Sequence, residues 1–266
     1  MLKFWIFFIY FGTVSFLHAQ KHDYVWQSGI NTTVTIDSTV FAIDFLNDLN
    51  PNLYKIPDSL LLGQANITIS DSSGNILFYS NGCLIRNRTG QTMDSGGGIN
   101  LGTDPSVYYN KCGPLSLGAY PVVQGLFSLP LIENKYGLFY IQYDETSYPW
   151  PNSLCKHNAF QYAIINMEDN QGLGKLEIKD SILLEGCFQV AVANKHANGR
   201  DWWILLADNT IGRFYRFLQT PERILGPWYQ DIENLTTTDT FFYAGWTEFS
   251  PDGSRTRGTV NNCANG

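Results

Sequence analysis

The densest group of side chains with acid–base chemistry is the run Lys-His-Ala-Asn-Gly-Arg-Asp at residues 195–201. Its ionisable side chains have the chemistry of a proton-transfer or anion-binding site. Its central Asn-Gly pair favours a tight hairpin turn, because glycine tolerates the positive φ that such turns require. We therefore interpret the run as a turn with Arg200 and Asp201 in solvent, and we retain His196 as a candidate ligand contact.

Aromatic side chains beside this turn and in an earlier loop are the other candidates for ligand contact. Trp202 and Trp203 follow the turn, and neighbouring side chains on a strand point to opposite faces. At least one of them should pack between sheets, and Trp202 is also retained as a candidate contact. Tyr148 and Trp150 lie in a proline-containing loop, where exposed rings would stack on sugar or peptide faces. Packing of that loop onto the protein is the alternative.

The best candidate for a metal site is the run at residues 166–172, which alternates oxygen-bearing side chains and is followed by Glu177. A calcium loop needs glycine at its sixth position, where Gln171 stands, and it joins two helices. We therefore predict a hairpin loop here. The chain contains no zinc-protease, esterase, phosphate-loop or dinucleotide motif. The sequence thus predicts no catalytic, cofactor-binding or metal-binding residue.

The elements that would position these residues follow a repeated pattern. Four places show an apolar strand, a tight polar turn and then a strand rich in aromatic or β-branched residues, and they recur at intervals of about 54–64 residues. Asn-Gly and Asp-Gly turns are strong signals for hairpins. The predicted turns lie at residues 71–74, 133–135, 198–199 and 251–253.

Between successive turns there is room for two more strands. In the third unit we expect them at residues 211–218 and 227–232, whereas residues 91–120 and 146–157 are expected to be loops. Four antiparallel strands per unit is the content of one propeller blade. The sequence therefore predicts an all-β propeller. A β-sandwich with irregular hairpins is the alternative, because it also has short strands at regular spacing.

Two longer stretches carry a resemblance to a known group of proteins. Residues 249–254 look like the Phe-Ser-Pro-Asp-Gly turn of WD-repeat-like (WD40-like) and Tricorn-type blades. Residues 69–83 and 195–203 resemble an uncharacterised group of exported bacterial β-propeller proteins, and the resemblance covers about residues 24–256. Members typically carry a C-terminal sorting domain for type IX secretion, which this sequence does not show. We expect an incomplete propeller, an open arc of three blades and a partial fourth, from a fragment or truncated product.

The run Ser-Asp-Ser-Ser-Gly around Asp71 is similar to the aspartate boxes of sialidase propellers. In those boxes serine, aspartate and glycine stand at alternate positions, whereas here the aspartate is one place early. We therefore predict that Asp71 is a turn residue that bonds to its own backbone.

The N-terminus has the layout of a secretory signal peptide. A short positive start is followed by an apolar stretch at residues 4–17 and then by polar residues, with cleavage expected beside Ala19 or Gln20. An uncleaved anchor is the alternative, but the stretch is shorter than the roughly 20 residues needed to span a bilayer. We expect a signal peptide at 1–20, a partial propeller domain at 21–266, and a protein that is secreted or on the outer cell surface.

The charge and the cysteine content limit which partners and which cellular compartment are expected. The net charge is −7 and only 15% of the residues are charged, without the basic cluster that nucleic acid or an anionic membrane would need. In an exported chain, cysteines without metal-site spacing favour disulfides. We predict a bond between Cys83 and Cys112, and the sequence leaves open the pairing of Cys155, Cys187 and Cys263.

The expected function is a binding or scaffolding module for a protein or glycan at the cell surface. The alternative is a propeller enzyme that acts on extracellular carbohydrate or peptide, such as a sialidase-like enzyme, a lyase or a hydrolase. An enzyme would need carboxylates, arginine or tyrosine on the inner strands of several blades. The expected inner strands at residues 67–69 and 190–193 are instead mainly apolar, which favours binding.

Overall fold

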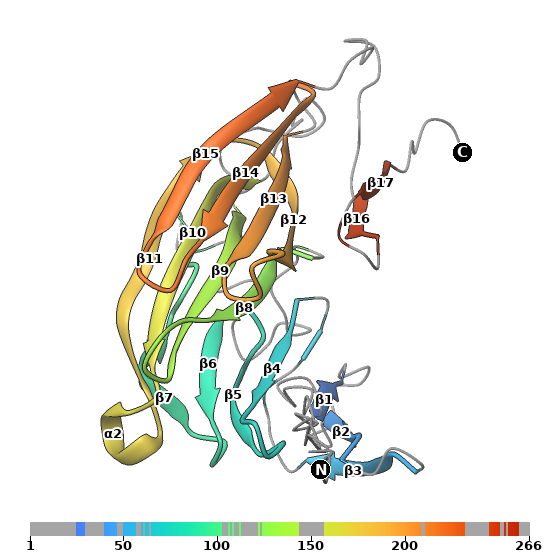
Figure 1. Ribbon diagram of the computed structural model, residues 1–266. Coiled ribbons are helices and arrows are strands. Elements are labelled where there is room, and N and C mark those ends of the chain that lie inside the picture. The colour runs from blue at the N-terminus through green and yellow to red at the C-terminus, as the bar shows by residue number, and fades with distance from the viewer. Residues whose placement is uncertain are drawn as a thin grey trace, which may run out of the picture.

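The computed structural model shows a chain built almost entirely of β-strands arranged in successive sheets (Figure 1). The all-β class is therefore confirmed. In the described part of the chain, no helix has the length and apolar character needed to cross a membrane. The structure describes residues 25–29, 40–46, 50–56, 60, 62–63, 65–102, 106, 108, 112, 122, 124–143, 157–208, 211–231, 245–250, 253 and 255–260.

The largest sheet has eight strands in the order β4-β5-β6-β7-β11-β10-β9-β8. It consists of two four-stranded antiparallel units, joined by a parallel pairing of β7 and β11 at Asp94 and Lys175. The strands are β4 (Ile67–Ser70), β5 (Ile76–Ser80), β6 (Leu84–Asn87), β7 (Thr92–Gly97), β8 (Leu126–Pro130), β9 (Lys135–Tyr143), β10 (His157–Asn166) and β11 (Lys175–Glu185).

Three smaller sheets complete the described strands. A four-stranded antiparallel sheet follows the chain order, with β12 (Phe188–Lys195), β13 (Trp202–Asp208), β14 (Arg213–Gln219) and β15 (Ile224–Asp231). An N-terminal sheet contains β1 (Val25–Ser28), β2 (Val40–Asp44) and β3 (Asn52–Ile56), and a C-terminal hairpin contains β16 (Gly245–Phe249) and β17 (Thr256–Val260). Four separate sheets account for the described strands, rather than the two of a sandwich.

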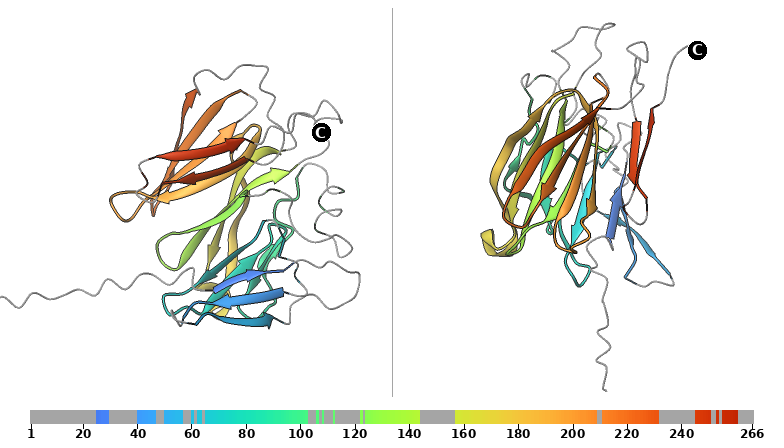
Figure 2. Two further views of the ribbon diagram at one scale, coloured as in Figure 1. Left: turned by 90° about the vertical axis from the view of Figure 1, so that its right-hand side faces the viewer. Right: turned by 45° about the horizontal axis from the view of Figure 1, so that its top comes forward.

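The first strands of successive units lie against one another. β1 contacts β4, β4 contacts β8, β8 contacts β12, and β12 contacts β16. The sheets accordingly follow one another from the blue N-terminal sheet to the red C-terminal hairpin in the left view of Figure 2. The chain therefore builds a series of sheets in which each unit starts beside the start of the previous one.

Three of the four expected turns are confirmed as the hairpin connections β4–β5, β8–β9 and β12–β13. At the fourth, between β16 and β17, Ser250 pairs with Arg255, and of the expected turn residues only Gly253 lies among the described ones. Two expectations about strands need correction. β7 lies in a stretch that was expected to be a loop, and its side chain at Met93 is buried in the core. β15 begins at Ile224 rather than at Pro227, so the proline lies inside the strand. β15 is an edge strand, and a proline is tolerated there because one side of the strand makes no ladder bonds.

A row of stacked aromatic rings forms the centre of the main core. The ring centroids of Phe127 and Phe139 are 5.2 Å apart, and those of Phe139 and Phe160 are 5.9 Å apart. Phe160 in turn lies 5.9 Å from Phe217 of β14, in the neighbouring sheet. The row therefore ties the β8–β11 unit to the β12–β15 sheet. A smaller cluster around Val40 and Tyr79 joins the N-terminal sheet to the β4–β7 unit.

The predicted disulfide between Cys83 and Cys112 is present, with Cα atoms 5.6 Å apart. It holds the segment that contains Tyr108 against the start of β6, and the Tyr108 hydroxyl donates a 2.7 Å hydrogen bond to the carbonyl of Cys83. Cys187 is also disulfide-bonded. Cys155 and Cys263 lie outside the described residues.

Removing the Cys83–Cys112 bond should destabilise the fold, because the bond closes a loop with a sequence separation of 29. The double variant Cys83→Ala/Cys112→Ala should lose about 3–4 kcal/mol of unfolding free energy in the chain-entropy model. Urea denaturation of the oxidised proteins measures this loss while leaving the bond of Cys187 in place. A loss below about 1 kcal/mol would contradict the assigned stabilising role.

Candidate functional site

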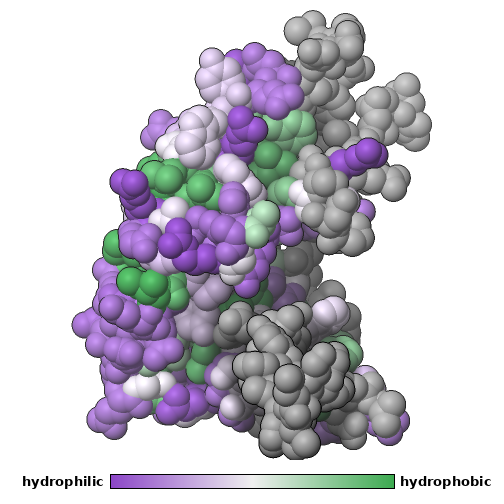
Figure 3. All heavy atoms as spheres, viewed as in Figure 1, coloured by the Kyte–Doolittle hydropathy of each residue, from purple (hydrophilic) through white to green (hydrophobic). Residues whose placement is uncertain are grey.

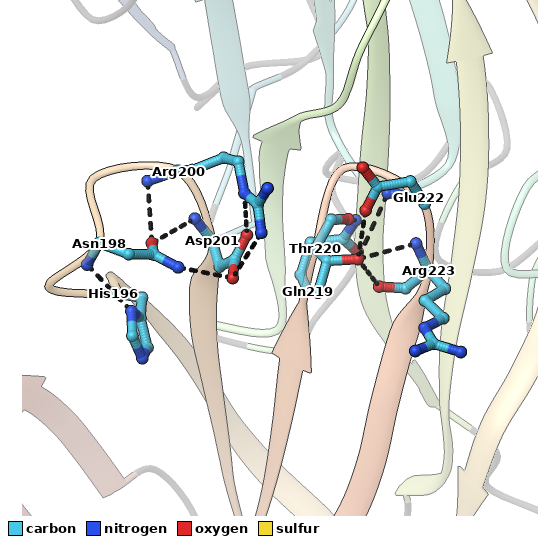
Figure 4. Close-up of polar contacts among 8 residues, drawn as sticks. All are labelled: His196, Asn198, Arg200, Asp201, Gln219, Thr220, Glu222 and Arg223. Atoms are coloured by element: carbon cyan, nitrogen blue, oxygen red, sulfur yellow. Dashed lines mark hydrogen bonds and ion pairs between the residues drawn. The ribbon is translucent and has the colours of Figure 1, made fainter.

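Two turns at one end of the β12–β15 sheet lie side by side, and each contains several polar side chains joined by hydrogen bonds (Figure 4). The first connects β12 to β13. The backbone N–H of His196 donates to the carbonyl of Asp201 at 2.8 Å, and the N–H of Gly199 donates to the carbonyl of His196 at 2.9 Å. Gly199 has a φ of 72°, which favours glycine. The predicted Asn-Gly turn is therefore confirmed.

The carboxylate of Asp201 fixes this turn from within. It accepts hydrogen bonds from Asn198 Nδ2 at 2.7 Å and from Arg200 Nε at 2.8 Å. Asn198 Oδ1 accepts from the backbone N–H groups of Arg200 and Asp201, each at 3.0 Å. Asp201 is only 4% exposed, so the expectation that it lies in solvent is wrong. The carboxylate is buried because it satisfies the donors of the turn, whereas Arg200 remains exposed.

His196 and Trp202, the two candidate contacts that the structure describes, differ in their surroundings. His196 Nδ1 accepts a 3.0 Å hydrogen bond from the N–H of Asn198, and its ring lies 5.5 Å from that of Trp203. Trp202 is half-buried and packs against the main core, so the expected packing role is confirmed for this tryptophan. Tyr148 and Trp150 lie outside the described residues.

The second turn connects β14 to β15 at residues 220–223. The Thr220 hydroxyl accepts a 3.1 Å hydrogen bond from the N–H of Arg223 and lies 3.1 Å from Glu222 Oε2. Gln219 Nε2 donates to the carbonyl of Thr220 at 2.6 Å. The side chains of Glu222 and Arg223 are thus presented outward on a turn that its own hydrogen bonds hold in shape.

A groove of about 620 Å³ lies between this second turn and the β8–β11 unit. Its walls are mainly apolar and include Tyr162, Ile164, Ile178, Leu183 and Ile224. Figure 3 shows hydrophobic side chains over β11, at the left of the view, between hydrophilic ones. The groove joins residues that are far apart in the sequence, so sequence analysis did not identify it.

Charged side chains of both signs line the same groove. Lys135 Nζ lies 2.9 Å from a Glu177 oxygen in an ion pair, and Asn166 Nδ2 donates to Glu177 at 2.9 Å. Hydrogen bonding from Lys135 and then from Asn166 lowers the pKa of Glu177. Glu133, Glu222 and Arg223 complete this charged lining. The groove therefore combines a mainly apolar wall with charged side chains of both signs.

The two acidic runs singled out in the sequence are turns. Residues 166–172 lie in the hairpin between β10 and β11, with the short α2 (Asp169–Gly172) at its tip. Asp71 accepts hydrogen bonds from the N–H groups of Ser73 and Asn75 at 2.8 and 2.9 Å, so its predicted role in a turn is confirmed. Among the described residues, no group of three or more histidine, cysteine or acidic side chains is placed to hold a metal ion.

Comparison with known proteins adds no assignment to this geometry. No protein-family model matches the chain, and no curated protein is similar enough to establish a relationship.

Stability should depend on pH through Asp201. Hydrogen bonds from Arg200 and then from Asn198 lower the pKa of this carboxyl. Its contribution is therefore present above the unfolded pKa of about 3.9 and is lost as the pH falls through the lower folded-state pKa. Asp201→Asn should lower the urea midpoint more at about pH 7 than at about pH 3.

A matched variant separates the two partners of this carboxylate. Arg200→Gln keeps the carboxylate and the Asn198 bond, so part of the pH dependence of stability should remain. The loss of stability should begin at a higher pH, because without Arg200 the pKa of Asp201 is lowered less. Equal destabilisation by Asp201→Asn at both pH values would contradict the assigned role of the charge.

Proposed function

We propose that this chain is part of a secreted or cell-surface β-propeller that serves as a binding or scaffolding module. The sheet order supports the proposed propeller, since three units are four-stranded antiparallel meanders whose first strands lie next to one another. That is the arrangement expected of blades around a common axis. The N-terminal sheet and the C-terminal hairpin are then partial blades at the two ends of an open arc.

An extracellular location fits the chemistry of the chain. Disulfides form and persist in oxidising compartments, and Cys83 is bonded to Cys112. The first twenty residues have the layout of a signal peptide. On these grounds we propose that this chain is exported, as are the bacterial propeller proteins that its sequence resembles.

The groove between the second and third four-stranded units is the observation that carries the binding role. Two isoleucines of its apolar wall are exposed, Ile132 in the β8–β9 turn and Ile178 on β11. An apolar surface of this kind, edged by polar residues, marks interaction sites. The lining runs from the β8–β9 turn across β10 and β11 to the β14–β15 turn, a span that suits an extended chain. We therefore infer that an extended segment of a partner protein binds there.

The charges in the lining favour a partner segment with charges of its own. Glu133 comes from the β8–β9 turn, whereas Glu222 and Arg223 both come from the β14–β15 turn on the opposite side. A segment with a basic residue near Glu133 and a neighbouring pair of basic and acidic residues near Glu222 and Arg223 would complement both sides. Such complementarity contributes to specificity and association rate more than to affinity.

Selection of phage-displayed dodecapeptides on the immobilised full chain tests this proposal. Enriched peptides should carry apolar residues with flanking charges and should bind Ile132→Asp or Ile178→Asp at least about tenfold more weakly, because a carboxylate in an apolar wall is costly. Ile211→Asp is the matched control. Ile211 is also an exposed isoleucine, but it lies in the β13–β14 turn at the other end of the sheet.

Two results would contradict the proposal. One is the absence of any enriched peptide, and the other is equal binding of the enriched peptides to wild type and to both groove variants. Circular dichroism of each variant shows whether a loss of binding comes from unfolding.

A further inference from the structure

The N-terminal sheet has two apolar faces, and only its inner face packs against the β4–β7 unit. Val40 of β2 lies on that inner face and belongs to the same buried cluster as Tyr79 of β5. Neighbouring side chains on a strand point to opposite faces, so Phe41 and Ile43 lie on the outer face. Figure 1 shows the sheet at the lower right margin of the molecule, with β4 and β5 on its inner side.

The outer face carries a row of apolar side chains that crosses all three strands. Trp26 pairs with Ile43, and Ile43 pairs with Leu53. Trp26 is 58% exposed and Leu53 is 66% exposed. Phe41, which is 38% exposed, follows in the next row. The solvent face of an antiparallel sheet is usually polar, so an exposed apolar row of this kind marks an interaction surface.

The apolar surface continues beyond the sheet. A crevice of about 480 Å³ extends from Trp26 and Ile43 to Ile67 and Ile69 of β4 and to Phe127 of β8. All of its lining residues are uncharged. The surface therefore suits an apolar partner rather than an ionic ligand.

We propose that this outer face packs against the same face of a second copy of the chain in a twofold-symmetric dimer. A twofold axis that runs along β2, between the two sheets, places β1 of each copy opposite β3 of the other. Trp26 then faces Leu53 of the second copy, and Ile43 faces its own counterpart. Each large ring meets an aliphatic side chain, an arrangement that suits two sheets packed about 10 Å apart.

The same axis keeps like charges apart. The rows of the outer face contain one charged residue, Lys55, which pairs with Phe41. The axis brings Lys55 opposite Ser28 of the second copy, because Ser28 occupies the corresponding position on β1. A different partner would need its own apolar sheet with matching side chains, whereas this chain already supplies a face that complements itself. A second copy is therefore the partner that the face fits.

The size of the face predicts weak association. Three strands of four or five residues cover roughly 200 Å² in projection. That is well below the roughly 800 Å² that each partner buries in a standard interface. We therefore expect a dissociation constant between about 10 µM and 1 mM. This inference concerns a surface other than the groove and does not rest on the function proposed for it.

Sedimentation velocity of residues 21–266, without the apolar N-terminal segment that would itself associate, tests the dimer. Between about 5 and 500 µM the average mass should rise from one chain toward two. Leu53→Asp should weaken association at least about tenfold, because the dimer would bury the new carboxylate against Trp26. Ile182→Asp is the matched control and should associate as the wild type does, since Ile182 is an exposed strand residue on β11.

A charge swap tests the pairing of β1 with β3. Trp26→Lys and Leu53→Glu should each weaken self-association. An equimolar mixture of the two variants should associate at least about tenfold more tightly than either variant alone. The reason is that the introduced lysine then faces the introduced glutamate, while the second contact between Trp26 and Leu53 is kept.

Several results would overturn the proposal. They are a monomer throughout the concentration range, equal association of the wild type and folded Leu53→Asp, equal weakening by Ile182→Asp, and a mixture of folded variants no stronger than its components. Circular dichroism shows whether each variant is folded, and if Trp26→Lys is unfolded, Leu53→Asp decides the outcome. Leu53→Asp should still bind the groove peptides, so failure of the dimer and failure of the groove are separate results.

Discussion

Aromatic stacking between two sheets positions much of the described structure. Phe160 of β10 lies 5.9 Å both from Phe139 in its own sheet and from Phe217 in the next. All three rings are almost completely buried, and burial of each contributes about 1.5–3 kcal/mol. This contact fixes the third unit above the second. It thereby sets the distance between the β14–β15 turn and β11, where the groove opens.

Short polar side chains hold the hairpin turns in shape. Asp71, Asn198 and Ser250 each accept hydrogen bonds from backbone N–H groups in the turn that joins the first two strands of a unit. The same motif in three units indicates a structural repeat.

The local features of the fold were predictable from the sequence, whereas the sites were not. The hairpin at Asn198-Gly199 and the role of Asp71 follow from the conformational preferences of a few adjacent residues. The burial of Asp201 depends on the folded turn, which surrounds the carboxylate with donors that no sequence pattern specifies. The groove depends on how sheets from distant segments lie against one another. Ile178 and Ile224 line the same groove only because β11 and β15 come together in the folded protein.

β7 illustrates a different reason for a missed element. Its glycines at 96 and 97 are typical of a loop, yet the strand pairs with β6 across a bulge and buries Met93. Tertiary packing thus overrides a weak local preference. The disulfide at Cys83 could be predicted because a long connection between two strands needs to be fixed, and its partner was the next cysteine in the chain.

A double-mutant cycle on Phe160 and Phe217 tests most directly whether neighbouring units are held face to face by aromatic packing. The unfolding free energies of Phe160→Leu, Phe217→Leu and the double variant would be measured by urea denaturation. A coupling of about 0.5–1.5 kcal/mol is expected. Phe160 paired with Val40, which belongs to the separate N-terminal cluster, should be additive within about 0.5 kcal/mol. A coupling indistinguishable from zero between Phe160 and Phe217 would contradict the account.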